Sequence, residues 1–461
     1  MQESAVQEGR YRLIRTLRVR NDNVPGVLGR LTTALGKADA NIGNIQTVFL
    51  GQHHIERELD VLVEDQAHLD RLIQALSQLE HVDVLEVRDE VLGLHHGGKV
   101  RMKSRVPIET VEMLRKVYTP GVADVCLRIA SDSSQRDQYT SIPNTVAIIT
   151  DGTAVLGLGN IGPYAAMPVM EGKAALLDQL VGLSGVPILL ATADPDEIVA
   201  AIAQIAPTFG GIQIEDVSAP RCFDIVKRLK KMLDIPVMHD DQDGTAAVVL
   251  GAVMTACRRV NIDMSSVVIG QIGLGAAGQA VADLLAFVTG NPVLGADINA
   301  DSVARHQSRG GTPSTQAEIM EHAQIVIATT GVKGLIAPAS VRPGQVILAL
   351  SNPDPEIDPA VARERGAALA ADGRSVNNAL GYPGLWKGTL ACGAREITRD
   401  MLIAAGTTLS GLASPTELLP EPLDRNAQRR VASAVAQTAA RSGVAKRVLD
   451  EDYFFDEGAG R

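Results

Sequence analysis

The sequence predicts an α/β protein in which a small βαββαβ domain precedes larger domains built on parallel sheets. Three observations indicate this class. The first 95 residues alternate strand and helix patterns in that order, later β-rich runs are each followed by a helical pattern, and one glycine-rich turn joins a strand to a helix. Such alternation favours parallel sheets covered on both faces. At 461 residues the chain exceeds one ordinary domain, and its length indicates about three.

The N-terminal region is expected to fold as a ferredoxin-like sandwich. Strands are predicted near residues 13–19, 42–50, 55–63 and 82–87, and helices over 27–38 and 69–79. The turn D-N-V-P-G at Asp22–Gly26 separates the first strand from the first helix, and Gly26 would let a ligand approach the backbone closely. The order βαββαβ is that of the ferredoxin-like fold.

Beyond a glycine-rich, basic connector at residues 93–103, the parallel-sheet region begins. Its expected strands are Thr145–Thr150, Val186–Ala191, Gly211–Ile214, Ile235–Met238 and Val267–Gly270. At the other end, the acidic tail Asp450–Glu457 is expected to be a solvated terminus.

Composition excludes several classes of partner. The net charge of −11 argues against nucleic acid or an anionic membrane, which attract basic surfaces. No apolar run is long enough to span a bilayer, and the N-terminal stretch MQESAVQEGRYR lacks the apolar core of a signal peptide. The four cysteines are scattered without a C-x-x-C pair, at Cys126, Cys222, Cys257 and Cys392. Reduced thiols in a cytoplasm explain this pattern better than disulfides or zinc.

The stretch VVIGQIGLGAAGQAVADLL at residues 267–285 predicts a Rossmann-type dinucleotide site, as a strand, a G-L-G-A-A-G turn and a helix. Gly273 permits the tight turn, Gly275 lets the backbone approach pyrophosphate, and Gly278 packs helix on strand. Ala276 and Ala277, between them, would place the helix N-terminus beneath the diphosphate.

The next strand, PVLGAD, ends in Asp297, about 19 residues past the last glycine, where a ribose-binding acid is expected. A carboxylate there accepts hydrogen bonds from both ribose hydroxyls and repels a 2′-phosphate, so NAD is favoured over NADP. Arg305 and Arg309 follow downstream and leave that preference open.

Two acidic pairs each follow a predicted strand. Glu215-Asp216 lies in GGIQIEDVSAPRCF, and Asp240-Asp241 lies in HDDQDGT. Neighbouring side chains of a continuous strand point to opposite faces, so both acids of a pair face one ion only if the strand stops there. Each pair alone could be a solvated loop or a helix cap. Since ligands bind outside the carboxyl ends of parallel strands, the two pairs together predict one Mg²⁺ or Mn²⁺ site.

From about residue 106 to 413 the chain resembles bacterial malic enzymes. The resemblance rests on seven ordered motifs: KVYTPGVA, TDGTAVLGLGNIGPYAAMPVMEGKA, IEDVSAPRCF, HDDQDGTA, GLGAAG, ALSNPDPEI and VNNALGYPG. It implies a substrate and metal domain over 100–255, an NAD-binding Rossmann domain over 256–395, and a helical segment over 396–461 packing back on the catalytic domain. The first domain, 1–95, with VRNDNVPGVLGRL, resembles an ACT domain, which binds amino acids or serves only in dimerisation.

The resemblance also implies roles for individual residues. Tyr118 corresponds to the general acid and Lys173 to the general base, with Asp240 as the partner of that lysine. Read alone, the tyrosine could be a core aromatic and the lysine a surface helix residue. A lysine base needs its pKa lowered from about 10.4 by burial or a nearby cation. The remaining implied contacts are Glu215, Asp216 and Asp241 to the metal; Thr330, Gly331 and Asn352 to the coenzyme; and Asn352, Asn377 and Asn378 to the substrate.

Two departures from the family pattern stand out. Asp243 replaces the histidine that family members commonly have in HDDQHGTA, which adds a negative charge near the site. The larger eukaryotic-type members have an arginine in the TDG segment that grips malate, whereas this chain has Thr153-Ala154. Another group must therefore bind that substrate carboxylate.

The resemblance implies metal-dependent oxidative decarboxylation of malate to pyruvate and CO₂ with reduction of NAD. A homodimer or higher homo-oligomer is expected, with a possible amino-acid effector at the ACT domain. Two alternatives remain: a malolactic-type enzyme that keeps NAD bound, and an amino-acid sensor whose dehydrogenase-like body is catalytically dead.

Overall fold

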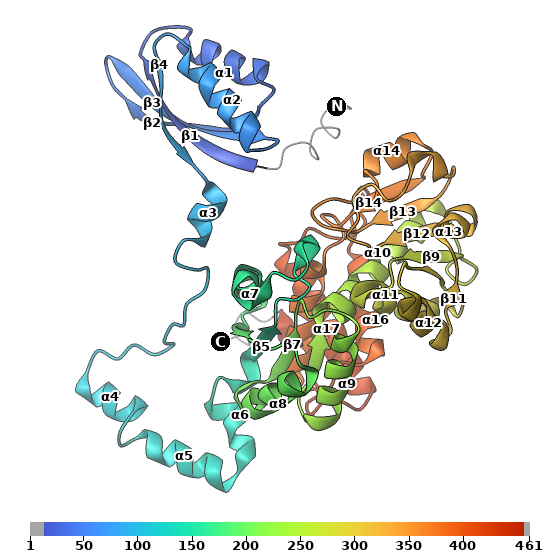
Figure 1. The fold of residues 1–461 in the computed structure, drawn as a ribbon. Helices are drawn as coiled ribbons and strands as arrows, with labels where there is room; N and C mark the ends of the chain where they lie inside the picture. The colour runs from blue at the N-terminus through green and yellow to red at the C-terminus, as the bar shows by residue number, and fades with distance from the viewer. Residues whose placement is uncertain (1–12, 456–461) are drawn as a thin grey trace. The chain divides into compact units, whose positions relative to one another are not determined.

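The computed structural model describes residues 13–455 and divides into two compact units, Met1–Lys99 and Val100–Arg461 (Figure 1). The N-terminal stretch without a signal-peptide pattern, 1–12, lies outside the described residues, as does the end of the acidic tail, 456–461. Within the described part, no helix is both long enough and apolar enough to cross a membrane.

The first unit has the predicted βαββαβ order. Its elements are β1 (Leu13–Asp22), α1 (Val27–Lys37), β2 (Asn41–Leu50), β3 (His54–Val63), α2 (Gln66–Ser77) and β4 (Val82–Arg88). The antiparallel sheet has the order β2-β3-β1-β4, and Leu17 and Val19 of β1 pack with Leu31 and Leu72 of the two helices. The ferredoxin-like prediction is confirmed. A short helix, α3 (Glu90–His95), occupies the start of the expected connector.

The second unit begins with short helices, α4 (Val111–Val117), α5 (Val122–Ser131), η1 (Ser133–Gln135), α6 (Arg136–Tyr139) and η2 (Ile142–Asn144). A parallel sheet follows, in the order β6-β5-β7-β8, made of β5 (Thr145–Thr150), β6 (Ser184–Leu189), β7 (Gly211–Ile214) and β8 (Val237–His239). The last strand starts two residues later than predicted because Pro236 has no N–H for a ladder hydrogen bond. Its crossover helices are α7 (Gly162–Val181), α8 (Pro195–Ile205) and α9 (Arg221–Met232).

A six-stranded parallel sheet has the order β11-β10-β9-β12-β13-β14. Counted from β9, this is the 3-2-1-4-5-6 order of a Rossmann domain. Its strands are β9 (Ile269–Ile272), β10 (Leu294–Ala296), β11 (Thr312–Pro313), β12 (Ile325–Ala328), β13 (Val346–Ala349) and β14 (Leu369–Asp372). Its helices are α11 (Ala276–Thr289), α12 (Ala300–Ser308), α13 (Gln316–His322) and α14 (Pro359–Glu364).

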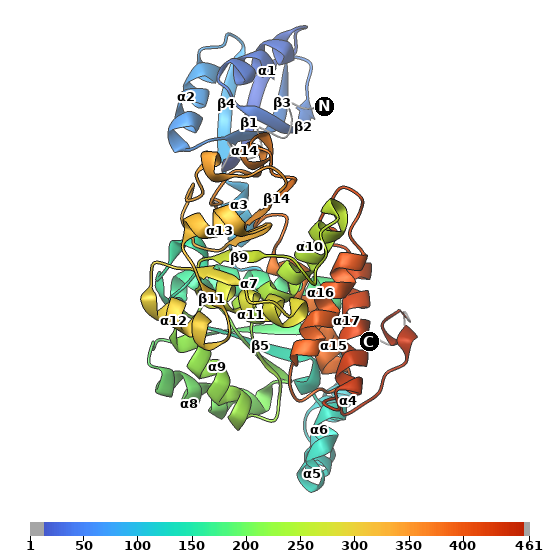
Figure 2. The ribbon, with the colours of Figure 1, turned by 90° about the vertical axis from the view of Figure 1, so that its right-hand side faces the viewer.

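A helical layer joins the two sheets, formed by α10 (Thr245–Val260), α15 (Tyr382–Ala391), α16 (Arg399–Gly411) and α17 (Arg425–Arg441). Figure 2 shows α10, α16 and α17 side by side. The approach of α10 to α16 requires glycine, since a Cβ on Gly406 would lie 2.6 Å from the Ala247 carbonyl oxygen. The finer division of this unit at residues 255 and 395 stays a prediction.

The acidic tail, expected to be a solvated terminus, is partly buried within the described residues. Residues 451–454 form a short 3₁₀ helix, η8 (Glu451–Phe454), and Phe454 is buried in the same core as α15 and α17. The charge pattern had suggested an exposed end, but burial of the aromatic ring outweighs it, because each ring removes a large apolar area from water.

Candidate active site

Acidic side chains gather at the carboxyl edge of the first parallel sheet. Glu215 and Asp216 follow β7, and Asp241 follows β8 in a short π-helical turn, η5 (Asp240–Gly244). One carboxylate oxygen from each of the three lies within 4.8 Å of the others. Asp216 takes a φ of 53°, which ends the strand and turns both members of the pair toward the same side. The strand therefore ends before the Glu215-Asp216 pair, as is required for both carboxylates to face one ion.

Lys173, on α7, reaches into this acidic group. Its Nζ lies 3.1 Å from Glu215 Oε1 and donates a hydrogen bond to Asp240. The side chain is only 11% exposed, which rules out the surface-lysine alternative. Burial by itself lowers the lysine pKa, but the charges of Asp240 and Glu215 outweigh it and hold that pKa well above its usual value. The two acidic neighbours therefore oppose the downward shift expected for a lysine base.

The turn that follows β8 is shaped around Asp240. A Cβ on Gly244 would lie 1.9 Å from Asp240 Oδ1, so the HDDQDGT turn requires glycine at this position. Burial raises the pKa of Asp240 to about 6, although the Lys173 ammonium opposes that shift. The aspartate is thus a buried acceptor held against the lysine.

Glu215 and Lys173 are themselves held by hydrogen bonds from residues that the sequence patterns did not predict. Trp386 Nε1 donates to Gln213 Oε1 at 2.7 Å, and Gln213 Nε2 donates to Glu215 Oε2 at 2.7 Å. The Tyr382 hydroxyl donates to the Lys173 carbonyl at 2.9 Å, and its ring centroid lies 4.8 Å from the lysine Nζ. A polar glutamine inside the fully buried strand GIQI was the one available signal.

The glycine-rich turn has the geometry of a dinucleotide loop. Gly273 has a φ of 88°, and a Cβ there would lie 2.8 Å from the Thr329 carbonyl oxygen. A Cβ on Gly278 would lie 1.9 Å from the Gly273 carbonyl, so that glycine allows helix and strand to meet. At Gly275 a Cβ would meet no described atom within 4 Å, so protein packing does not explain this glycine, whereas the approach of a diphosphate does. Ala276 and Ala277 begin α11, which contacts η5.

Asp297 lies where the ribose acid is expected, after β10. Its Oδ2 accepts from the Leu274 amide at 2.7 Å and its Oδ1 from the Asn299 amide at 2.8 Å. Each carboxylate oxygen accepts about two hydrogen bonds, so capacity remains for ribose hydroxyls.

The two arginines that left coenzyme preference open are engaged elsewhere. The Arg305 guanidinium stacks on the Phe223 ring at 5.0 Å, and that of Arg309 at 5.6 Å. Arg309 also pairs with Asp283 at 2.5 Å. The Asp283 carboxylate offsets the charge of Arg309, which favours NAD, whereas the ring contact leaves the charge of Arg305 unchanged.

Thr330 and Gly331 form a loop after β12 that is held by hydrogen bonds to Glu356 and Ser351. This buried glutamate accepts from the Thr330 amide at 2.6 Å and from the Ser351 hydroxyl at 2.5 Å. The Gly331 amide in turn donates to Ser351 Oγ at 2.7 Å. No sequence motif predicts this role of Glu356, because it depends on hydrogen bonds that join the loops after β12 and β13.

The three candidate asparagines lie on neighbouring loops. Asn352 Nδ2 and Asn377 Nδ2 each donate to the Gly373 carbonyl at 3.4 Å. Asn377 caps a short 3₁₀ turn, η7 (Asn378–Leu380), which contacts η5. The structure therefore brings Asn377 and Asn378 beside the turn that bears Asp240 and Asp241.

Tyr118 is the candidate that its own chain does not bring to this cluster. It ends α4 and is 67% exposed. Within residues 13–455 its hydroxyl makes no hydrogen bond, and Lys173 pairs with Glu215 and Asp240 instead. The core-aromatic alternative is wrong for this residue.

Both departures from the family sequence pattern, Asp243 and Thr153-Ala154, make defined contacts in the structure. Asp243 accepts from the His239 amide at 3.3 Å and lies 3.7 Å from Lys230 Nζ, which compensates the added charge. Asp243 is not among the clustered carboxylates. Thr153 and Ala154 bind the 216–218 loop through Ser218 N→Thr153 Oγ1 and Ala154 N→Asp216 O.

The clustered carboxylates fit a hard divalent cation. The group found among the described residues offers only carboxylate oxygens, the donors that Mg²⁺ and Mn²⁺ prefer. Burial raises the pKa of Glu215, and the nearby charge of Asp241 adds to that increase despite Lys173. A dication would relieve this repulsion.

Comparison with known proteins identifies the family. Residues 97–230 match the family described as malic enzyme, N-terminal domain, and residues 12–87 match the ACT domain family. The chain is 50% identical to NAD-dependent malic enzyme 1 of Bacillus subtilis over 93% of this chain and 98% of that relative. This chain belongs to the malic enzyme family. A second malic enzyme, the NAD-dependent one of Geobacillus stearothermophilus, is 38% identical over 90% of this chain and 92% of its own length.

Solved malic enzyme structures share the fold of the second unit. The malic enzyme of Pyrococcus horikoshii has a TM-score of 0.74 and 36% identity, covering 80% of this chain and 94% of its own. The NAD-dependent malic enzyme of Thermotoga maritima has a TM-score of 0.71 and 36% identity, covering 75% and 98%.

Proposed function

We propose that this malic enzyme oxidises malate and decarboxylates it to pyruvate and CO₂ with reduction of NAD, using Mg²⁺ or Mn²⁺. The observation that carries the proposal is the position of Lys173, buried against Asp240 and Glu215 beside the clustered carboxylates. The turn that holds two of these acids contacts the helix that starts at the dinucleotide loop. Base, cation ligands and coenzyme loop thus meet at one edge of the sheet.

Each component has residues to hold it. Glu215, Asp216 and Asp241 hold the cation, and the 273–278 turn with Asp297, Thr330 and Gly331 holds the coenzyme. When bound, the cation lowers the pKa of the substrate hydroxyl and stabilises charge on its oxygen, and NAD accepts the hydride.

Lys173 takes the proton of the C2 hydroxyl. The charges of Asp240 and Glu215 raise the pKa of this lysine. Glu215 supplies one of the two charges that raise the lysine pKa, so a cation held by Glu215 would lower that pKa and favour the base form. Asp240 orients the Lys173 ammonium so that its proton can be returned to the substrate.

Tyr118 delivers the proton to C3 after CO₂ has left, and we propose that it does so across a homodimer interface. The α4–α5 pair carries exposed apolar residues on both helices, at Val111, Leu114, Val117 and Leu127. Exposed apolar residues that lie together commonly mark a protein–protein interface, so a second copy of the chain would cover these side chains. Mixing Tyr118→Phe with Lys173→Ala protein tests this, because only a shared site regains activity in mixed dimers.

We further propose an amino-acid effector at the ACT unit and a cytoplasmic location. The ACT family match and the left-handed Gly26 after β1, with a φ of 88°, support an effector site. All four cysteines are free, which suits a reducing compartment.

A spectrophotometric assay tests the proposal. Purified protein with malate, NAD and Mn²⁺ should form NADH and pyruvate, with less activity on NADP and none without metal. Amino acids added singly would then reveal an effector. Absence of NADH under every amino-acid condition would favour the sensor alternative.

A malolactic outcome is the second candidate. A Bacillus subtilis relative named a bifunctional malic/malolactic enzyme is 39% identical over 80% of this chain and 97% of its own length. Product analysis separates the two, since lactate without net NADH indicates the malolactic reaction and pyruvate with NADH the malic reaction.

A further inference from the structure

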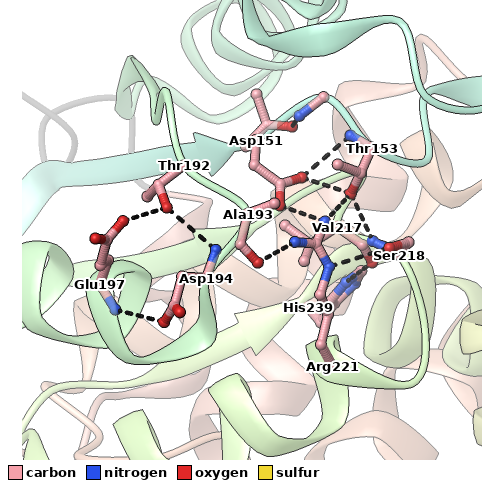
Figure 3. A network of polar contacts seen from close by, with 12 residues as sticks. Asp151, Thr153, Thr192, Ala193, Asp194, Glu197, Val217, Ser218, Arg221 and His239 are labelled. Atoms are coloured by element: carbon pink, nitrogen blue, oxygen red, sulfur yellow. Dashed lines mark hydrogen bonds and ion pairs between the residues drawn. The ribbon is translucent and has the colours of Figure 1, made fainter.

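Arg221, the first residue of α9, connects three loops at the edge of the sheet that bears the carboxylates (Figure 3). Its guanidinium forms an ion pair of 2.5 Å with Asp151. The other acceptors are Thr153 Oγ1, the Ala193 carbonyl and, at 3.1 Å, Ser218 Oγ. Asp151 and Thr153 follow β5, Ala193 follows β6 and Ser218 follows β7. One side chain therefore joins the ends of three parallel strands.

The loop held by Arg221 is the one that presents Asp216. The Ala154 amide donates to the Asp216 carbonyl at 2.9 Å, and the Ser218 amide donates to Thr153 Oγ1 at 3.1 Å. Asp216 has a left-handed φ of 53°, which costs free energy for a residue with a Cβ and persists only where surrounding contacts enforce it. The Arg221 contacts supply that constraint from the far end of the loop.

The guanidinium is already committed to protein acceptors. Nε donates to Ser218, Nη1 donates to Ala193 and Nη2 donates to Thr153. Nη2 also forms the ion pair with Asp151. The Arg221 side chain is 17% exposed and that of Asp151 1%. Arg221 thus acts on the protein rather than on the free carboxylate of a substrate.

We propose that Arg221, paired with Asp151, is a positioning residue that holds loop 215–220 so that Glu215 and Asp216 face the same cation as Asp241. The inference rests on the proposed function in that these carboxylates bind a divalent ion. Groups behind metal ligands commonly change metal affinity or activity by about 10–100-fold when they are removed. The pair therefore determines metal affinity, whereas an ordinary buried ion pair would affect only folding stability.

Mn²⁺ binding to the full-length protein, measured by electron paramagnetic resonance without malate or NAD, tests the proposal. Arg221→Gln should weaken Mn²⁺ binding by about 10–100-fold, with NAD affinity by calorimetry unchanged. Excess Mn²⁺ should restore most of kcat. Arg221→Lys keeps the positive charge but loses the planar guanidinium with its several donors. Its Mn²⁺ affinity should therefore lie between those of the wild type and Arg221→Gln. Asp151→Asn should also weaken Mn²⁺ binding.

Arg228→Gln is the matched control, because Arg228 lies on the same helix and pairs with Asp196 and Asp224 at the surface. Its Mn²⁺ affinity should equal that of the wild type. Wild-type Mn²⁺ affinity in folded Arg221→Gln, or equal losses of Mn²⁺ and NAD binding, would overturn the proposal. If Arg221→Gln does not fold, wild-type affinity in Arg221→Lys and Asp151→Asn overturns it. Failure of the wild-type protein to bind Mn²⁺ would overturn the proposed function as well.

Discussion

At the residue scale, the structure places a buried lysine beside carboxylates that could hold a divalent cation. Lys173 lies among Glu215, Asp240 and the ring of Tyr382, so its charge is balanced within the protein. The charges of Asp240 and Glu215 raise its pKa, so the proposed role as general base requires one of these charges to be offset.

Replacing Lys173 by alanine should lower the rate of malate oxidation by roughly 10²–10⁴-fold, the usual contribution of a general base. Mn²⁺ affinity should not decrease, because the lysine is not a cation ligand and its removal takes a positive charge away from the site. NADH formation and Mn²⁺ resonance titration measure the two effects. Lys227→Ala, an exposed lysine on α9, is the control, and near wild-type oxidation by Lys173→Ala would contradict the assignment.

Mn²⁺ affinity should also depend on pH. Burial raises the pKa of Glu215, so a proton competes with the cation at a higher pH than for an ordinary carboxylate. Affinity should be complete above the raised pKa and fall about tenfold per pH unit below it, because one proton is released on binding. Titrations between about pH 5 and pH 7.5, with circular dichroism to check folding, measure this. A pH-independent affinity would exclude Glu215 as a ligand.

Sequence reasoning predicted the residues that stand in recognisable local patterns and missed those that act across the fold. The acids after β7 and β8 could be predicted because each pair ends a strand. Gln213 and Trp386 could not, since their hydrogen bond joins positions 173 residues apart. The same applies to Arg221, whose acceptors lie after three different strands.

At the element scale, the α4–α5 pair is the part of the second unit on which the proposed homodimer depends. Its apolar residues are exposed, and Tyr118 lies between the two helices without a hydrogen bond from its hydroxyl among the described residues. Strand boundaries were predicted to within two or three residues. The shift of β8 follows from Pro236, an effect that hydrophobicity alone does not reveal.

Leu114→Glu should convert the proposed homodimer to monomer and remove malate oxidation, because a charge on the exposed apolar face of α4 cannot be desolvated in an interface. Sedimentation and the activity assay measure the two effects together. Glu112→Gln, on the same helix and already polar, is the matched control. A Leu114→Glu protein that stays dimeric, or a fully active monomer, would contradict the shared site.

At the scale of the whole molecule, the two units have separate cores and only the second contains the clustered carboxylates. Mn²⁺ at about 100 times its dissociation constant should stabilise the catalytic unit by about 2.7 kcal/mol and leave the ACT unit unchanged. Differential scanning calorimetry with and without Mn²⁺ measures this, with Asp241→Asn as the control. Equal upward shifts of both units would indicate binding elsewhere.

The central claim is that Glu215, Asp216 and Asp241 bind a single divalent ion beside Lys173. Crystals grown with Mn²⁺, with anomalous diffraction used to locate manganese, test it most directly. One strong peak is expected within coordination distance of all three carboxylates. A peak elsewhere, or none at a Mn²⁺ concentration that supports activity, would contradict it.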